Sequence, residues 1–300
     1  MPEPQGMEMG NHENEKVKIG LVQMSMSENQ QDNISKAVKM IAEAAEKGAR
    51  IICLPELFST RYFCQEQNND NFELAEKIPG KITDALAEIA RKKKVVIIAG
   101  IFEKRSAGVY NNSAAVIDSS GDILGIYRKM HIPEDPVDYH EKLYFAPGEK
   151  FMSFKTEYGE IGVLICWDQW FPEAARITAM KGAKIIFYPT AIGWDPEDSK
   201  EKKEIQSSAW ETIQRSHGIA NGVFIASANR VGKEGNIDFW GSSFVSGPFG
   251  EIISKAGNNS EEILVAECDL DAVKSTRMGW PFLRDRRVDS YGEITGRFLD

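Results

Sequence analysis

The chain has 300 residues, of which 42% are hydrophobic and 27% charged, and its formal net charge is −9. A chain of this length can bury a substantial apolar core, which favours a single domain over residues 17–300 after a polar, disordered tail at residues 1–16. The net charge is acidic, and positive and negative residues are interspersed, which argues against nucleic acid or a membrane surface as partner. Because there is neither a membrane-length apolar run nor a secretory leader, we expect a cytoplasmic protein.

The cysteine and histidine pattern excludes several classes of site. The four cysteines form no C-x-x-C pair and no zinc spacing, so reduced thiols are expected. The four histidines are scattered, and the chain has no H-E-x-x-H, Walker A or G-x-G-x-x-G motif. We therefore expect neither a metal nor a cofactor.

The first half of the chain alternates strands and helices. In chain order the pattern predicts a strand at 17–24, a helix at 33–48, a strand at 49–56, a helix at 83–94 and a strand at 94–102. A hairpin follows, with strands at 113–118 and 122–128, and then a loop rich in proline and glycine at 130–149. This is a β-α-β-α-β unit with a hairpin added.

The second half repeats the alternation. It predicts a strand at 161–166, a helix after Pro172, a strand at 183–189, a helix through Trp210 and Ile213, and strands at 223–229, 239–245, 250–254 and 262–269. No linker separates the halves, so their strands can form two sheets packed face to face with helices outside. The segment GWPFLRDRR, at 279–287, is too polar for a core.

Cys166, in the stretch ICWDQWFPEAAR, is a candidate nucleophile. It is expected to end a strand just before a turn and a helix, where backbone N–H groups and the helix dipole would favour a thiolate. The alternative is inert packing, the usual role of a buried cysteine. Glu56 and Lys129 also follow apolar runs. Each charge alone would be read as a solvated strand end, and only their occurrence with Cys166 makes them candidates.

These residues carry a family resemblance. Glu56 in LPELF, Lys129 in YRKMHIP and Cys166 in ICWDQWFPE resemble, in order and context, the Glu-Lys-Cys set of the nitrilase superfamily of carbon-nitrogen hydrolases. Further stretches are similar to the branch that hydrolyses N-carbamoylputrescine: YFCQ, EKLYFAPG, FYPTAIG and GWPFLRDRR. The similarity extends from about residue 17 to about residue 291.

The resemblance implies a fold and a set of roles. The fold would be a four-layer αββα sandwich, with two packed mixed β-sheets and helices on the outer faces. Glu56 would act as general base and acid, Lys129 would stabilise the oxyanion, and the backbone N–H of Trp167 would be a second oxyanion donor. Glu141 would be the second glutamate, near the lysine. The reaction would convert N-carbamoylputrescine and water to putrescine, carbon dioxide and ammonia, in polyamine biosynthesis from agmatine.

The stretch after Cys166 bears on the substrate. Enzymes acting on N-carbamoyl D-amino acids have two arginines there that hold the substrate carboxylate, whereas this chain has Gln169 and Trp170. A ureido amine is therefore the expected substrate. Acidic and aromatic side chains suit its ammonium. The candidates are Tyr62, Glu134, Asp135, Asp138, Trp170, Thr190 and Trp194, although such residues are more often solvated or packed. Asp168 is expected to brace the turn.

Several alternatives stay open. A Cys-His dyad could use His131 or His217 instead of Glu56. Among enzymes, the competitors are a ureido-acid hydrolase of the N-carbamoyl-β-alanine type and an ω-amidase, and a more remote possibility is a non-catalytic scaffold. The family also implies a homodimer or a larger homo-oligomer, with the C-terminal segment at about 270–300 in a subunit interface.

Overall fold

Two six-stranded β-sheets and a small three-stranded sheet form the scaffold in this computed structural model, which describes residues 16–135 and 138–299. The first sheet has the order β15 (Glu262–Asp269), β1 (Lys16–Gln23), β2 (Ile51–Cys53), β3 (Val96–Ser106), β4 (Val109–Ile117), β5 (Ile123–Arg128). The second has the order β14 (Ile252–Lys255), β13 (Phe244–Ser246), β10 (Phe224–Asn229), β8 (Ile185–Thr190), β7 (Gly159–Val163), β6 (Ser153–Thr156). The small sheet joins β11 (Val231–Glu234), β12 (Ile237–Trp240) and β9 (Gly193–Trp194).

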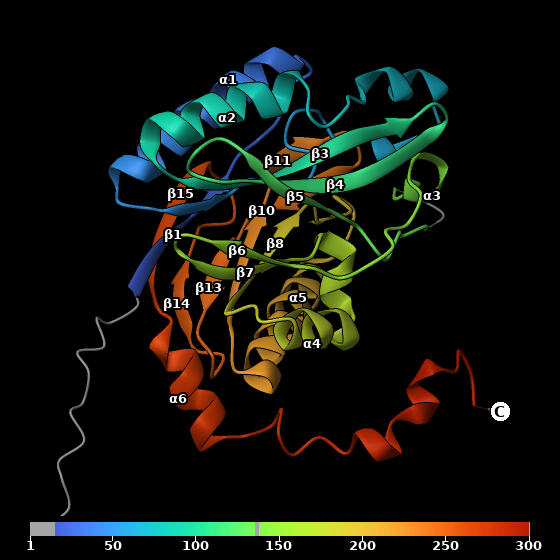
Figure 1. The fold of residues 1–300 in the computed structure, drawn as a ribbon. Helices are drawn as coiled ribbons and strands as arrows, with labels where there is room; N and C mark the ends of the chain where they lie inside the picture. The colour runs from blue at the N-terminus through green and yellow to red at the C-terminus, as the bar shows by residue number, and fades with distance from the viewer. Residues whose placement is uncertain (1–15, 136–137, 300) are drawn as a thin grey trace, which may run out of the picture.

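The two large sheets share one plan. In the first, β1, β2 and β3 are parallel and their outer neighbours are antiparallel. In the second, β7, β8 and β10 are parallel, again with antiparallel neighbours. The sheets lie face to face, with β1 against β10 and β3 against β8 (Figure 1). The repeated alternation read from the sequence therefore corresponds to two half-structures that pack on each other.

Helices cover the outer faces of both sheets. On the first lie α1 (Gln30–Glu46) and α2 (Lys81–Lys93), and on the second lie α4 (Pro172–Met180) and α5 (Lys200–Asn221) (Figure 1). Side chains alternate along each strand accordingly: Ile51 and Cys53 of β2 pack between the sheets, whereas Ile52 packs under α1 and α2. The arrangement confirms the predicted four-layer αββα sandwich.

Two predicted boundaries were wrong for local reasons. The first helix begins at Gln30 rather than residue 33, because the side chain of Asn29 accepts hydrogen bonds from the N–H groups of Gln31 and Asp32 and caps the helix there. The single strand expected at 239–245 is two strands. Gly241 and Ser242 both have a φ of 55°, and this left-handed turn takes the chain from β12 of the small sheet to β13 of the second sheet.

The C-terminal region leaves the sandwich. A helix that was not predicted, α6 (Asp271–Gly279), follows β15, and residues 280–299 then run past the end of α4 with most side chains exposed (Figure 1). The polar segment 279–287 is outside the core, as expected. At the other end Lys16 already belongs to β1, and the rest of the predicted tail lies outside the described residues. None of the helices in the described part of the chain is both long and apolar enough to cross a membrane.

Candidate active site

Glu56 is fixed just beyond the end of β2. Its side chain is completely buried, and its Oε1 accepts hydrogen bonds from Asn112 Nδ2 at 2.7 Å and from Lys129 Nζ at 2.8 Å. The second oxygen, Oε2, has no hydrogen-bond partner among the described residues. The backbone of Glu56 passes close to Gly100 of β3. Only glycine leaves room there, because a Cβ at residue 100 would lie 2.8 Å from the Cα of Glu56. Glu56 thus has one anchored oxygen and one oxygen available for a proton.

Lys129, the residue after β5, lies between two carboxylates. Its buried ammonium donates hydrogen bonds to Glu56 Oε1 and to both carboxylate oxygens of Glu141, at 2.9 and 2.7 Å. Burial alone would lower the pKa of Lys129, but the charges of Glu141 and Glu56 raise it well above its usual value. The site therefore holds a permanent cation.

Glu141 opens the short helix α3 (Glu141–Tyr144) at the other side of the lysine. Its Oε1 also accepts a hydrogen bond from the hydroxyl of Tyr62 at 2.7 Å. Burial raises the pKa of Glu141 to about 7; Lys129 and the Tyr62 hydroxyl oppose the rise, and the charge of Glu56 adds to it. Burial, with the charge of Glu56, therefore makes Glu141 a carboxylate that titrates near neutral pH.

Cys166 lies in a turn rather than at a strand end. Strand β7 stops at Val163, and Cys166 adopts a φ of 40°, so the sulfur leaves the sheet and lies 3.7 Å from the carbonyl oxygen of Ala191. Burial raises the pKa of the Cys166 thiol well above its usual value; Glu56 and Glu141 add to this and Lys129 opposes it. The expected thiolate, stabilised by a helix terminus, was wrong, because α4 begins only at Pro172 and burial dominates. Burial therefore favours the thiol form of the sulfur.

Asp168 braces the turn that contains Cys166. Its Oδ2 accepts hydrogen bonds from the Tyr127 hydroxyl at 2.7 Å and from the Ile165 N–H at 3.0 Å, and its Oδ1 is contacted by the backbone N–H and Nδ1 of His131 at 3.0 and 2.7 Å. It therefore links the Cys166 turn to the segment that carries Lys129. The sequence suggested a bracing role but not these partners.

The alternative Cys-His dyad is contradicted. His131 is engaged with Asp168, and its ring stacks on Phe171 with centroids 3.7 Å apart. His217 places its Nε2 2.8 Å from the carbonyl oxygen of Gln169. Neither imidazole contacts Cys166, whereas the charges of both glutamates act on the thiol.

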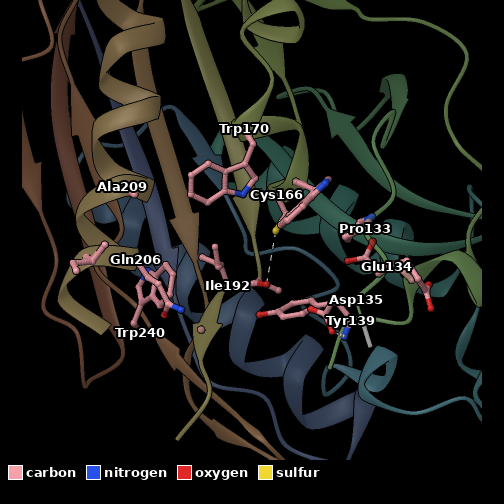
Figure 2. Close-up of a pocket in the computed structure, with 15 residues that line it drawn as sticks. Pro133, Glu134, Asp135, Tyr139, Cys166, Trp170, Ile192, Gln206, Ala209 and Trp240 are labelled. Carbon is pink, nitrogen blue, oxygen red and sulfur yellow. Dashed lines mark hydrogen bonds between the residues drawn. The ribbon is translucent and has the colours of Figure 1, made fainter. Parts of the chain in front are cut away.

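A cavity of about 350 Å³ opens beside the sulfur. In Figure 2, Pro133, Glu134 and Asp135 lie on one side of Cys166, and Gln206, Ala209 and Trp240 lie on the other. The remaining lining residues are Tyr139, Glu141, Trp167, Trp170, Ala191, Ile192, Gly193 and Ile205. A volume of this size suits a small, extended substrate.

Three of the predicted substrate-binding residues, Glu134, Asp135 and Trp170, line this cavity. The other four are not among its lining residues, so the prediction was wrong for them. Thr190 donates to the carbonyl oxygen of Tyr188 at 3.0 Å, and Asp138, which is largely buried, hydrogen-bonds Asn236.

The two aromatic candidates lie behind the cavity wall. The Tyr62 hydroxyl donates a hydrogen bond to Glu141. The Trp194 ring packs against that of Trp240, with centroids 5.2 Å apart, and its Nε1 donates to the carbonyl oxygen of Lys203. They support lining residues rather than forming the wall.

Sequence reasoning also missed lining residues. Tyr139, Gln206 and Trp240 come from a loop, the first turns of α5 and the small sheet. Nothing in their local sequence distinguishes them from packing residues, because their role depends on where three separate elements meet. Within residues 16–135 and 138–299, no group of three or more His, Cys, Asp or Glu side chains is placed to hold a metal ion.

Comparisons with known proteins agree with this geometry. The carbon-nitrogen hydrolase family model matches residues 18–278. The N-carbamoylputrescine amidase of Oryza sativa subsp. japonica is 44% identical over 287 residues, covering 92% of this chain and 93% of the relative. A citrullinase of Francisella tularensis is 40% identical over 292 residues, covering 94% of this chain and 99% of the relative.

A solved structure is similar over nearly its whole length. The crystal structure of a carbon-nitrogen hydrolase from Helicobacter pylori G27 matches with a TM-score of 0.92 and 44% identity, covering 95% of this chain and 100% of that one. The shared fold, the matched family model and the buried Glu-Lys-Cys cluster support one conclusion. The chain belongs to the carbon-nitrogen hydrolase family of the nitrilase superfamily.

Proposed function

We propose that the protein hydrolyses the ureido group of N-carbamoylputrescine to putrescine, carbon dioxide and ammonia, a step in polyamine biosynthesis. The proposal is supported by the similarity to plant enzymes of that name and by the cluster of Glu56, Lys129, Glu141 and Cys166 beside a cavity. A carbonyl flanked by two nitrogens is a poor electrophile. Its hydrolysis calls for a nucleophile, a base and a stabilised oxyanion together.

The charge of the cavity carries the choice of substrate. Three of its lining residues, Glu134, Asp135 and Glu141, are acidic. Among the described residues that line it, none is Lys, Arg or His. A ureido amine would place its ammonium among carboxylates. A ureido acid would bring a carboxylate to a wall with no cation, which costs affinity through repulsion and desolvation.

We assign one step of the reaction to each of these groups. As the sulfur of Cys166 attacks the carbamoyl carbon, its proton passes to Glu56, and Lys129 with the Trp167 N–H stabilises the negative carbonyl oxygen. Glu56 then protonates the first nitrogen, which leaves, and a thiocarbamate remains on Cys166. Water adds as Glu56 takes its proton, the C–S bond breaks as Glu56 returns that proton to the sulfur, and the carbamic acid decomposes to carbon dioxide and the second amine.

The test compares substrates that differ at the far end. We expect kcat/KM for N-carbamoylputrescine to exceed that for N-carbamoyl-β-alanine and for citrulline by about 100-fold or more, with putrescine and ammonia formed in equal amounts. Citrulline is included because of the citrullinase relative. It carries a carboxylate beside its amine. A preference for either acid would refute the proposal.

A variant pair locates the ammonium site. Glu134 accepts hydrogen bonds from the backbone N–H of Lys142 and contacts His140, and Asp135 Oδ1 accepts from the N–H groups of Asp138 and Tyr139. Glu134→Gln and Asp135→Asn keep an acceptor for these contacts but remove the charge. We expect each to raise KM for N-carbamoylputrescine about tenfold or more, equivalent to about 1.4 kcal/mol. We expect kcat/KM for N-carbamoyl-β-alanine and for citrulline to rise.

We also propose a homodimer or larger homo-oligomer. Large apolar side chains are exposed along residues 280–299, among them Trp280, Phe282 and Phe298, and Met180 of α4 is 54% exposed. Apolar surface of this extent is typical of subunit interfaces. A cytoplasmic location is proposed because all four cysteines are free. Sedimentation of the full chain and of a chain ending at residue 279 tests the assembly.

A further inference from the structure

A buried ion pair, Arg230 with Glu234, lies next to the proposed catalytic residues but is not among the residues that line the cavity. Arg230, between β10 and β11, is fully buried, and its Nη1 binds both carboxylate oxygens of Glu234 at 2.9 and 3.0 Å. The guanidinium also faces the rings of Tyr62 and Phe239, at 5.8 and 5.1 Å from their centroids. Burying such a pair costs desolvation energy, so its retention calls for an explanation beyond stability.

The guanidinium holds the backbone of the catalytic glutamate. Arg230 Nη2 donates hydrogen bonds to the carbonyl oxygens of Glu56 at 2.8 Å and Leu57 at 3.1 Å, and Nη1 lies 3.4 Å from that of Thr60. Leu57 has a φ of 49°, a left-handed conformation that is unfavourable for leucine. The fork of the guanidinium satisfies the carbonyl groups that this turn directs inward. The guanidinium thereby fixes the position of the Glu56 backbone, from which the catalytic carboxylate extends.

The carboxylate of the pair holds the other end of the same segment. Glu234 Oε2 accepts a hydrogen bond from the backbone N–H of Tyr62 at 2.6 Å, and the Tyr62 hydroxyl binds Glu141. Arg230 and Glu234 therefore fasten the segment 56–62 at both ends. One end carries Glu56, and the other carries the tyrosine that orients Glu141.

We propose that Arg230 and Glu234 are positioning residues for catalysis: together they align Glu56 and Glu141 on opposite sides of Lys129. The pair also ties this segment to the small sheet, because Glu234 ends β11, which pairs with β12, and Trp240 of β12 lines the cavity. The inference rests on the proposed function only in taking Glu56 and Glu141 as members of the reacting site.

Two charge-preserving variants test it. Arg230→Lys keeps the cation but loses the fork, and Glu234→Asp keeps the anion but withdraws it from the Tyr62 N–H. We expect kcat to fall by about 10- to 100-fold in Arg230→Lys, with KM changed less than about threefold, because small misplacements of a reacting group have effects of this size. In Glu234→Asp we expect the acid limb of the pH–rate profile to move to higher pH, because the Tyr62 hydroxyl is no longer held in position to donate its hydrogen bond to Glu141.

The matched control is Arg215, which also bonds a glutamate four residues away, Glu211, and a backbone carbonyl, that of Gly250, but lies on α5 outside the site. Arg215→Lys is expected to leave kcat and the pH profile unchanged. The charged groups facing Glu141 are Lys129 and Glu56, so the acid limb reports on the same cluster.

A substrate-independent readout separates this inference from the proposed function. The rate at which iodoacetamide alkylates Cys166 reports how well Glu56 and Lys129 are aligned, and we expect it to fall in both variants whatever the natural substrate. Should either single variant not fold, Arg230→Met combined with Glu234→Met removes the pair without leaving an unpaired charge. Folded variants that keep wild-type kcat, pH profile and alkylation rate would show that the pair is merely structural.

Discussion

Removal of the Tyr62 hydroxyl gives a sharp test of the electrostatics of the site. The pKa of Glu141 is about 7, and the hydrogen bond that the Tyr62 hydroxyl donates stabilises the ionised carboxylate and so lowers that pKa. Glu141 must be ionised to hold the ammonium of Lys129 in place. Activity should therefore fall as the pH decreases through about 7 in the wild-type protein.

The size of the change follows from the lost bond. A hydrogen bond to a charged group contributes about 1.5–3 kcal/mol, and one pKa unit corresponds to about 1.36 kcal/mol. Tyr62→Phe should raise the pKa of Glu141 by about 1 to 2 units, which moves the acid limb to about pH 8–9. Activity at pH 7 should fall roughly 5- to 50-fold and recover in more alkaline buffer.

The assay measures initial rates between about pH 5.5 and pH 10, at saturating and at limiting substrate. Tyr144→Phe is the control, because Tyr144 is also buried and lies in α3, but its hydroxyl bonds the backbone of Glu66 and Asn68 rather than Glu141. An acid limb that stays in place in Tyr62→Phe, or moves equally in Tyr144→Phe, would contradict this account of the site.

Three further predictions concern the nucleophile and its supports. Cys166→Ala should abolish turnover while the melting temperature stays nearly unchanged; full activity would eliminate Cys166 as nucleophile. Gly100→Ala should destabilise the protein by about 1–3 kcal/mol in urea denaturation and lower kcat, because its Cβ would meet the Glu56 backbone at 2.8 Å; an unchanged kcat would argue against tight positioning. Asp168→Ala should lower the free energy of unfolding by about 3 kcal/mol or more, because several buried donors lose their acceptor, whereas Tyr127→Phe should lower it by only about 1 kcal/mol. Equal urea midpoints for the two variants would disprove the bracing role.

The sequence was sufficient to predict the layers of the fold and the family of the chain. Strand and helix periodicities are local properties, so the repeated alternation correctly predicted two sheets covered by helices. Glu56, Lys129 and Cys166 were chosen because they follow apolar runs and match a family pattern. Strand β5 runs in the same direction as β2, because two antiparallel pairings separate it from β3. Glu56 and Lys129 therefore follow strands that end at the same edge of the sheet, and they lie 2.8 Å apart although 73 residues separate them.

Other features depend on contacts that no local pattern contains. The cavity wall combines Tyr139, Gln206 and Trp240 from three separate elements, and Tyr62 turned out to support Glu141 rather than line the cavity. The thiolate expected for Cys166 was wrong because burial raises the pKa of the thiol and α4 begins only at Pro172, and neither fact is visible in the local sequence. Periodicity and motif therefore determined the elements and the family, whereas packing of the two half-structures decided burial, charge state and the shape of the site.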